Sequence, residues 1–164
     1  MTNFTRRGLV LVAVIFLHGC ASSNTAPNPR LSDGERRILG AIQMANEEGG
    51  YGAARNGIKN YPSVVANAIH HGDKDPAALA PIFIASLRTD AASAEMQAGI
   101  LATVLLYVGD APFAAALNTA PPAARQMSLL LLSHALRKEG SSYELYLDPA
   151  KFPRTTALVG SRTP

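Results

Sequence analysis

Apolar residues recur with helical spacing from about residue 31 to residue 140. The first such stretch opens at Ser32 and Glu35, which have the spacing of a capping box, and Gly49-Gly50 closes it. Between these ends one apolar stripe is formed by Ile38, Ile42 and Ala45, with Leu39 beside them. The pattern predicts a helix here, followed by one or two helical turns between Gly50 and Tyr61.

Helical spacing continues over residues 62–71, 76–87, 91–108, 111–117 and 127–138. Asp75 and Asp90 precede two of these stretches, where an N-cap carboxylate would accept the free N–H groups of a helix start, and Asp110 with Pro112 starts a third. The stretch after Asp90 is apolar around most of its circumference. We therefore expect it to form the buried, central helix.

These patterns predict an all-α domain over residues 31–140. Two arrangements fit them, a small helical bundle and a short stack of helical hairpins. The second is suggested by the similar helix starts at Asp75 and Asp110, and a stack would offer a concave face to a peptide or protein. The pattern alone does not separate the two.

Residues 141–164 form a C-terminal tail that we expect to be extended and irregular. Tyr143, Leu145 and Leu147 alternate with polar positions. This alternation suits a strap packed along the helices, or an exposed strand that a partner's sheet edge can pair with. From Lys151 onward, the prolines and Gly160 predict little regular structure.

The N-terminus has the order of an export signal: Arg6-Arg7, an apolar run over residues 9–17, and small residues before Cys20. The run is shorter than the roughly 20 residues of a membrane span, so we interpret residues 1–19 as a cleaved signal peptide. Residues 5–10 also resemble a twin-arginine export motif. The strongly hydrophobic run favours ordinary export in the unfolded state.

Leu17-His18-Gly19-Cys20 resembles the lipobox of bacterial lipoproteins, although His18 departs from the small or hydroxyl residue usual there. The resemblance covers only the first 20 of 164 residues. It implies that Cys20 becomes the acylated N-terminus. No aspartate follows Cys20 directly, and in this respect the chain resembles lipoproteins that are sorted to the outer membrane. The alternative is a simple secretory signal with a chance cysteine. Residues 20–30 are then a lipidated cysteine and a polar tether.

Charge argues against nucleic-acid binding. The formal charge is +3, but removing Arg6 and Arg7 leaves 13 basic against 12 acidic residues. Too little positive charge remains to hold phosphates. Acylation would also consume the only cysteine, which excludes a disulfide, a thiol nucleophile and a thiolate metal site in the mature domain.

Three groups of reactive side chains occur in the sequence, and the spacing of none of them indicates a catalytic or metal site. His70 and His71 diverge by about 100° on a helix, which does not suit chelation of a metal. Ser133 and His134 also point apart, outside any nucleophile-elbow motif. The pair Glu47-Glu48 ends a helix with a solvated face rather than flanking a cleft. We expect no enzyme activity and no cofactor.

Tyr51 and Tyr146 are the predicted contacts to a partner, because tyrosine is enriched at protein interfaces and both stand in polar or glycine-rich surroundings. The sequence therefore predicts a non-enzymatic lipoprotein on the periplasmic face of the outer membrane, attached through Cys20. Its helical domain would bind another envelope protein as an accessory, pilot or immunity factor. A small enzyme acting on cell wall or lipid, and a purely structural lipoprotein, are the alternatives.

Overall fold

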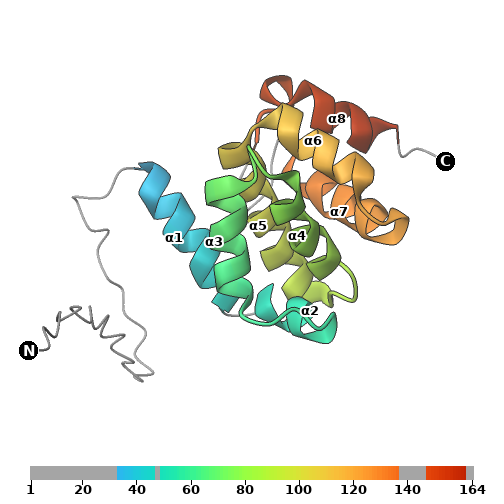
Figure 1. Ribbon diagram of the computed structural model, residues 1–164. Coiled ribbons are helices and arrows are strands. Elements are labelled where there is room, and N and C mark those ends of the chain that lie inside the picture. Colours follow the sequence, from blue (N-terminus) through green and yellow to red (C-terminus); the bar gives the residue numbers. More distant parts are fainter. Residues whose placement is uncertain (1–32, 47–48, 137–146, 162–164) are drawn as a thin grey trace, which may run out of the picture. The chain divides into compact units, whose positions relative to one another are not determined.

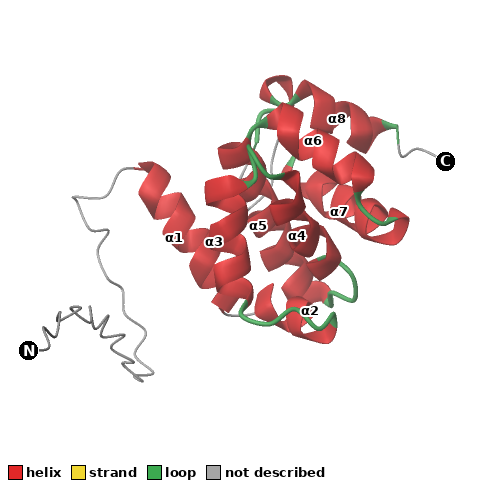
Figure 2. Ribbon diagram, viewed as in Figure 1, coloured by secondary structure: helices red, strands yellow, loops and turns green. Residues whose placement is uncertain are grey.

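The computed structural model describes residues 33–46, 49–136 and 147–161. The chain divides into two units, residues 1–30 and 31–164, and all described residues belong to the second. The described part is helical and contains no strand, as Figure 2 shows. The prediction of an all-α domain is confirmed.

Eight α-helices and two short 3₁₀ helices make up the described residues (Figure 1). In chain order they are α1 (Asp33–Asn46), α2 (Gly49–Arg55), α3 (Tyr61–His71), η1 (Pro76–Leu79), α4 (Ala80–Ala85), α5 (Ala91–Val108), α6 (Asp110–Thr119), α7 (Pro122–Ala135), η2 (Pro149–Lys151) and α8 (Pro153–Gly160).

Helix α5 lies at the centre of this unit, as its all-round apolar pattern predicted. It contacts α1, α2, α3, α6 and α7, which come from both ends of the domain sequence. In a stack of hairpins each repeat would contact only its neighbours. The helices therefore form a bundle around α5, with fully buried residues Ile100, Leu101, Val104 and Leu105 in its middle.

Two aromatic rings help to fix the helices around this core. Phe83 of α4 and Phe113 of α6 are both fully buried, and their rings meet edge to face at 5.3 Å with an interplanar angle of 89°. This geometry places the positive edge of one ring on the negative face of the other. The pair joins elements that are 30 residues apart in sequence.

Local capping explains the predicted starts at Asp75 and Asp90. The Asp75 carboxylate accepts the Ala77 N–H at 3.0 Å and begins η1. The Asp90 carboxylate accepts the Ser93 N–H at 3.0 Å, while the Asp90 N–H donates to the Ser93 hydroxyl, so the two residues form a reciprocal capping box at α5. The Ser93 hydroxyl and N–H together hold the pKa of Asp90 below its usual value.

The predicted helix start at Asp110 is confirmed, but the Asp110 side chain does not cap this helix. Helix α6 begins at Asp110 itself, and its N-cap is Gly109, with φ of 88° in the left-handed region that glycine adopts without strain. The Asp110 carboxylate accepts hydrogen bonds from the N–H groups of Arg154 and Thr155, both at 2.8 Å. It therefore caps α8 rather than its own helix.

The C-terminal tail is more regular than predicted. Of residues 141–164, the structure describes 147–161, and Pro153–Gly160 form the helix α8 where we expected little regular structure. That expectation was wrong because Pro153 occupies the first turn of a helix, where its missing N–H costs nothing. Helix α8 contacts α6 and α7, and the alternating positions 141–146 lie outside the described residues.

Candidate functional site

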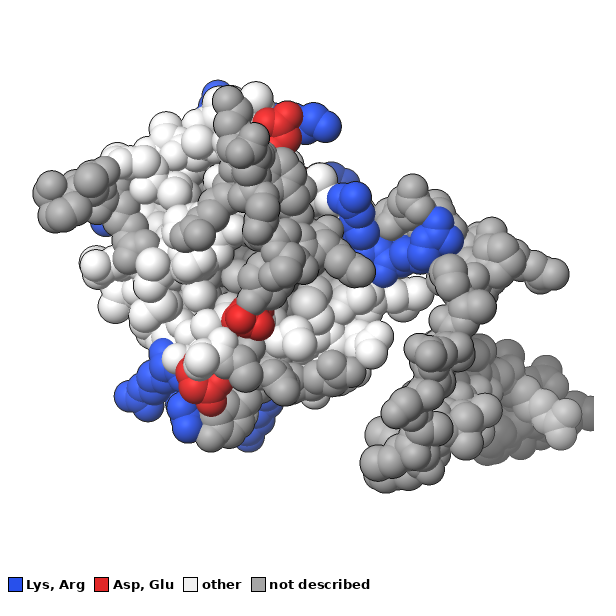
Figure 3. Space-filling view, turned by 180° about the vertical axis from the view of Figure 1, so that it is seen from behind, with Lys and Arg blue, Asp and Glu red and all other residues white. Residues whose placement is uncertain are grey.

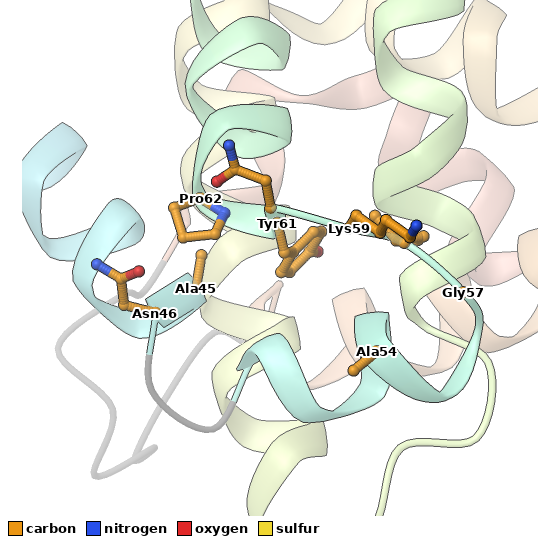
Figure 4. A pocket seen from close by; sticks show the side chains of 9 residues that line it. Ala45, Asn46, Ala54, Gly57, Lys59, Tyr61 and Pro62 are labelled. Carbon is orange, nitrogen blue, oxygen red and sulfur yellow. The ribbon is translucent and has the colours of Figure 1, made fainter.

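An open pocket of about 670 Å³ lies where α1 ends, α2 ends and α3 begins (Figure 4). Its walls are mostly small or apolar, and its rim carries amides and one lysine. The lining residues are Ala45, Asn46, Ala54, Gly57, Ile58, Lys59, Asn60, Tyr61 and Pro62. In Figure 4 the Tyr61 ring lies between Ala45 and Pro62 on one side and Lys59 on the other.

The floor of the pocket is the Tyr61 ring, which is 3% exposed. Its hydroxyl donates a hydrogen bond to the Gln97 Oε1 atom at 2.7 Å, inside the bundle. Burial raises the pKa of the Tyr61 hydroxyl far above its usual value, and the hydrogen bond to Gln97 offsets only part of this rise. Tyr61 is therefore a neutral donor at every physiological pH.

A chain of neutral polar groups continues from Tyr61 through the core. The Gln97 Nε2 atom donates to the Ile82 carbonyl at 2.9 Å and lies 3.4 Å from the Ser86 hydroxyl. The Ser128 hydroxyl donates to the Ser86 hydroxyl at 3.0 Å. These groups come from α3, α4, α5 and α7, so four elements share one buried hydrogen-bond chain. Because each member has a partner, the chain fixes how these elements pack together.

The wall of the pocket that α2 provides is attached to the loop between α4 and α5. The Asn56 Nδ2 atom donates to the Gly52 carbonyl at 2.8 Å and also to the Leu87 carbonyl. These bonds hold the end of α2 against a segment that lies 31 residues further along the chain. The wall is thus tied to the bundle by side-chain hydrogen bonds as well as by packing.

The predicted contact residues are placed only in part. Tyr51 belongs to α2, the helix that contributes Ala54 to the pocket, and its side chain is outside the described atoms. Cys20 and Tyr146 lie outside the described residues. The sequence did not single out Tyr61 or Gln97 as a pair, although a glutamine within the apolar helix α5 was a sign that a buried partner would be needed.

The histidine pair and the Ser133-His134 pair form no catalytic or metal-binding arrangement in the described structure. His70 and His71 are exposed at the end of α3 with ring centroids 6.5 Å apart, and no group of three potential metal ligands occurs among the described residues. The Ser133 hydroxyl donates to the Leu130 carbonyl at 2.6 Å, and the neighbouring His134 is exposed. Glu47 and Glu48 lie outside the described residues.

In comparisons with known proteins, the chain matches no family model, no curated protein and no solved structure. Within the described residues, no helix has both the length and the apolar composition that a membrane crossing requires.

Proposed function

We propose that the chain is a lipoprotein of the bacterial outer membrane, held at the periplasmic face through acylated Cys20. Its helical domain binds another envelope protein, as an accessory, pilot or immunity factor, and catalyses no reaction. The lipobox-like residues 17–20 support the anchor, and the polar residues that follow separate it from the first helix. At about 0.8 kcal/mol per buried CH₂, more than one acyl chain would make the attachment nearly permanent.

The chemistry of the pocket is the observation that carries the binding role. Among its described lining residues the charge comes from Lys59, and the neighbouring polar side chains are the amides of Asn46 and Asn60. Amides both donate to and accept from a peptide backbone, and Lys59 can pair with a carboxylate. The Tyr61 hydroxyl donates to Gln97 inside the bundle, so the part of Tyr61 that lines the pocket is its ring. This set of groups suits recognition of a neutral or acidic protein segment.

The anchor is tested by labelling cells with radioactive palmitate. We expect label in the wild-type protein and none in the Cys20→Ala variant, and we expect the wild-type protein to fractionate with the outer membrane. If palmitate does not enter the wild-type protein, or still enters Cys20→Ala, the lipoprotein proposal is wrong.

The binding role is tested by placing a photo-cross-linking amino acid at Lys59 in living cells. Lys74, which is exposed in the turn after α3, provides a matched control position. We expect one reproducible adduct with an envelope protein from position 59 and none from position 74. Ala54→Arg would fill the pocket and remove this adduct, whereas Ala123→Arg, on the exposed side of α7, would leave it unchanged.

Two results would contradict this proposal. Equal adducts from positions 59 and 74, or an adduct that survives Ala54→Arg, would place the contact elsewhere than at the pocket. Turnover of purified peptidoglycan or phospholipid by the domain would instead establish the enzymatic alternative. If the domain neither cross-links to a protein nor turns over these substrates, the protein would be a purely structural lipoprotein.

A further inference from the structure

Gly57 ends helix α2 with a backbone conformation that favours glycine. Its φ of 75° lies in the left-handed region, which glycine adopts without strain. The Gly57 N–H donates to the Ala54 carbonyl at 3.0 Å, and the Ile58 N–H donates to the Ala53 carbonyl at 2.9 Å. These two bonds are the pair that closes a helix in a Schellman motif. Glycine at position 57 therefore serves to end α2.

Asn56, the residue before this glycine, serves a different purpose, because its amide ties α2 to the loop between α4 and α5. The Asn56 Nδ2 atom donates to the carbonyls of Gly52 and Leu87, and an amide nitrogen has two hydrogens to donate. A side chain that only accepts hydrogen bonds could replace neither bond. The two structural needs thus place an asparagine directly before a glycine.

An asparagine before a glycine is prone to lose its side-chain amide, because glycine has no side chain to hinder the attack of its main-chain nitrogen. The Gly57 nitrogen, after giving its proton to the solvent, forms a bond to the Asn56 Cγ atom. The Cγ–Nδ2 bond breaks, and Nδ2 takes a proton from water and leaves as ammonia. The resulting succinimide ring takes up one water molecule and opens to aspartate or isoaspartate. One water is consumed, one ammonia is released, and no atom is oxidised or reduced.

We propose that Asn56 is a deamidation site that α2 protects while it is held against the α4–α5 loop, and that Asn56 converts irreversibly to a carboxylate when this contact opens. In the closed state the Gly57 N–H is bonded to the Ala54 carbonyl, and the Asn56 amide is bonded to two further carbonyls. Three hydrogen bonds must therefore break before the attack. Gly57 is exposed and Asn56 is half-buried, so water reaches the pair once it opens. The protection of Asn56 depends on neither the lipid anchor nor the binding role.

The carboxylate product cannot close the contact again. An ionised carboxylate has no hydrogen to donate, and at position 56 it would face the carbonyl oxygens of Gly52 and Leu87. Isoaspartate would also add one carbon to the main chain, so the bonds that end α2 would no longer fit. Ala54 and Gly57 line the pocket (Figure 4), so an open α2 removes one of its walls. Deamidation thus turns a transient local opening into a permanent loss of this wall.

The reaction is followed on the purified protein by ion-exchange chromatography and by mass spectrometry of the peptide that contains residues 56–57. Uncharged residues make up most of the described surface in Figure 3, and 16% of all residues are charged, so one new carboxylate is readily resolved.

Each of the three hydrogen bonds favours the closed state by roughly fivefold, so Asn56 in the folded protein should react about 100-fold more slowly than in protein unfolded in urea. Asn60 precedes Tyr61 rather than a glycine and should keep its amide in both states. Equal rates at Asn56 in the two states, or conversion of Asn60 as fast as that of Asn56, would overturn the proposal.

Gly52 offers a variant that loosens this contact directly. A Cβ atom at Gly52 would lie 3.0 Å from the Ala85 carbonyl oxygen and 3.1 Å from the Thr89 methyl group, so Gly52→Ala pushes α2 away from the α4–α5 segment. Overpacking of this kind should speed the conversion of Asn56 by about tenfold. A Cβ atom at Gly40 would meet nothing within 4 Å, so Gly40→Ala is the control and should react at the wild-type rate. A folded Gly52→Ala protein that reacts at the wild-type rate would contradict protection by α2.

Hydrogen exchange of the Gly57 N–H measures the same opening in the wild-type protein and needs no variant. It should give the same protection factor as deamidation, and fast exchange at Gly57 with slow conversion of Asn56 would overturn the proposal. Asn56→Asp carries the product and should speed exchange at Gly57 by at least about tenfold. Asn118→Asp adds the same charge at an exposed position of α6 and should leave exchange at Gly57 unchanged. Wild-type exchange at Gly57 in Asn56→Asp would show that a carboxylate keeps the contact closed, and would refute the loss of the wall.

Discussion

Asp110 and Thr155 are joined by a hydrogen bond of 2.8 Å from the Thr155 N–H to the Asp110 carboxylate, across 45 residues of sequence. The second carboxylate oxygen accepts the Arg154 N–H, so one side chain at the start of α6 satisfies two free N–H groups at the start of α8. A carboxylate at a helix N-terminus also interacts favourably with the helix dipole. The C-terminal helix is thereby attached to the bundle at a defined point.

Removing this cap should loosen α8 selectively. We expect Asp110→Ala to lower the free energy of unfolding by about 1–2 kcal/mol, because two N–H groups lose their acceptor. Hydrogen exchange should accelerate in α8 and remain slow in α5. Asp73→Ala, at an exposed position in a turn, is the control and should change neither quantity. Equal exchange in α8 of both variants would show that packing alone holds this helix.

Replacing two glycines by alanine should change the stability of the domain in opposite directions. A Cβ atom at Gly72 would lie 2.8 Å from a Leu79 methyl and 2.9 Å from a Val108 methyl, whereas one at Gly40 would meet nothing within 4 Å. Gly72→Ala should therefore destabilise the domain by about 1–3 kcal/mol through overpacking. Gly40→Ala in α1 should stabilise it by about 0.5–1 kcal/mol through helix propensity. Urea unfolding of both variants measures the contrast, and a shift of the same sign in both would contradict it.

The buried Tyr61 hydroxyl should make stability depend on alkaline pH. Its pKa in the folded state is raised above the unfolded value of about 10, so the folded protein binds the proton more tightly. The stabilisation is fully present below pH 10 and is lost as the pH rises above it, with a slope of at most about 1.4 kcal/mol per pH unit. Unfolding of wild type and Tyr61→Phe should be compared from pH 8 to pH 11, roughly the range spanning the unfolded value.

At neutral pH the same substitution probes the hydrogen bond. Tyr61→Phe leaves the Gln97 Oε1 atom buried without its donor and should cost about 1–2 kcal/mol. In a Gln97→Met background the cost should be smaller, because no buried acceptor is left behind. If Tyr61→Phe had the same alkaline pH dependence as wild type, the contribution of Tyr61 ionisation would be refuted.

A threonine pair tests the cost of an unsatisfied hydroxyl. Thr155 is fully buried, and its Oγ1 atom has no hydrogen-bond partner within the described structure. Thr155→Val should raise the free energy of unfolding by about 1 kcal/mol, because an unpaired hydroxyl is replaced by a methyl group. The Thr103 hydroxyl, in contrast, donates to the Gly99 carbonyl at 2.9 Å, so Thr103→Val should cost about 0.5–1.5 kcal/mol. Thermal unfolding of the two variants should move in opposite directions.

Features that depend on neighbours in sequence were predicted well. The starts at Asp75 and Asp90 follow from caps that reach two or three residues ahead, and the apolar circumference of α5 identified the central helix. Asp110 looks the same in sequence, but its hydrogen-bond partners lie in α8. No local pattern distinguishes a carboxylate that caps its own helix from one that caps a distant helix.

The candidate site was harder to predict for a similar reason. The pairing of Tyr61 with Gln97 depends on how α3 packs on α5, which spacing along the chain does not specify. Tyr51 was selected from composition, and the structure places the backbone of its helix beside the pocket. Helix α8 was missed although Pro153 and Gly160 stand where a short helix commonly begins and ends.

The hydrogen-bond chain from Tyr61 to Ser128 has a consequence for binding at the pocket. Its members are buried and satisfied, so the ring that forms the pocket floor keeps one orientation before any ligand arrives. Ordering a side chain on binding costs roughly 0.5–1.5 kcal/mol, and this cost is avoided for a residue that folding has already immobilised. An incoming protein segment would lose conformational entropy on binding, but the pocket floor would lose almost none. This preorganisation favours higher affinity, mainly through slower dissociation.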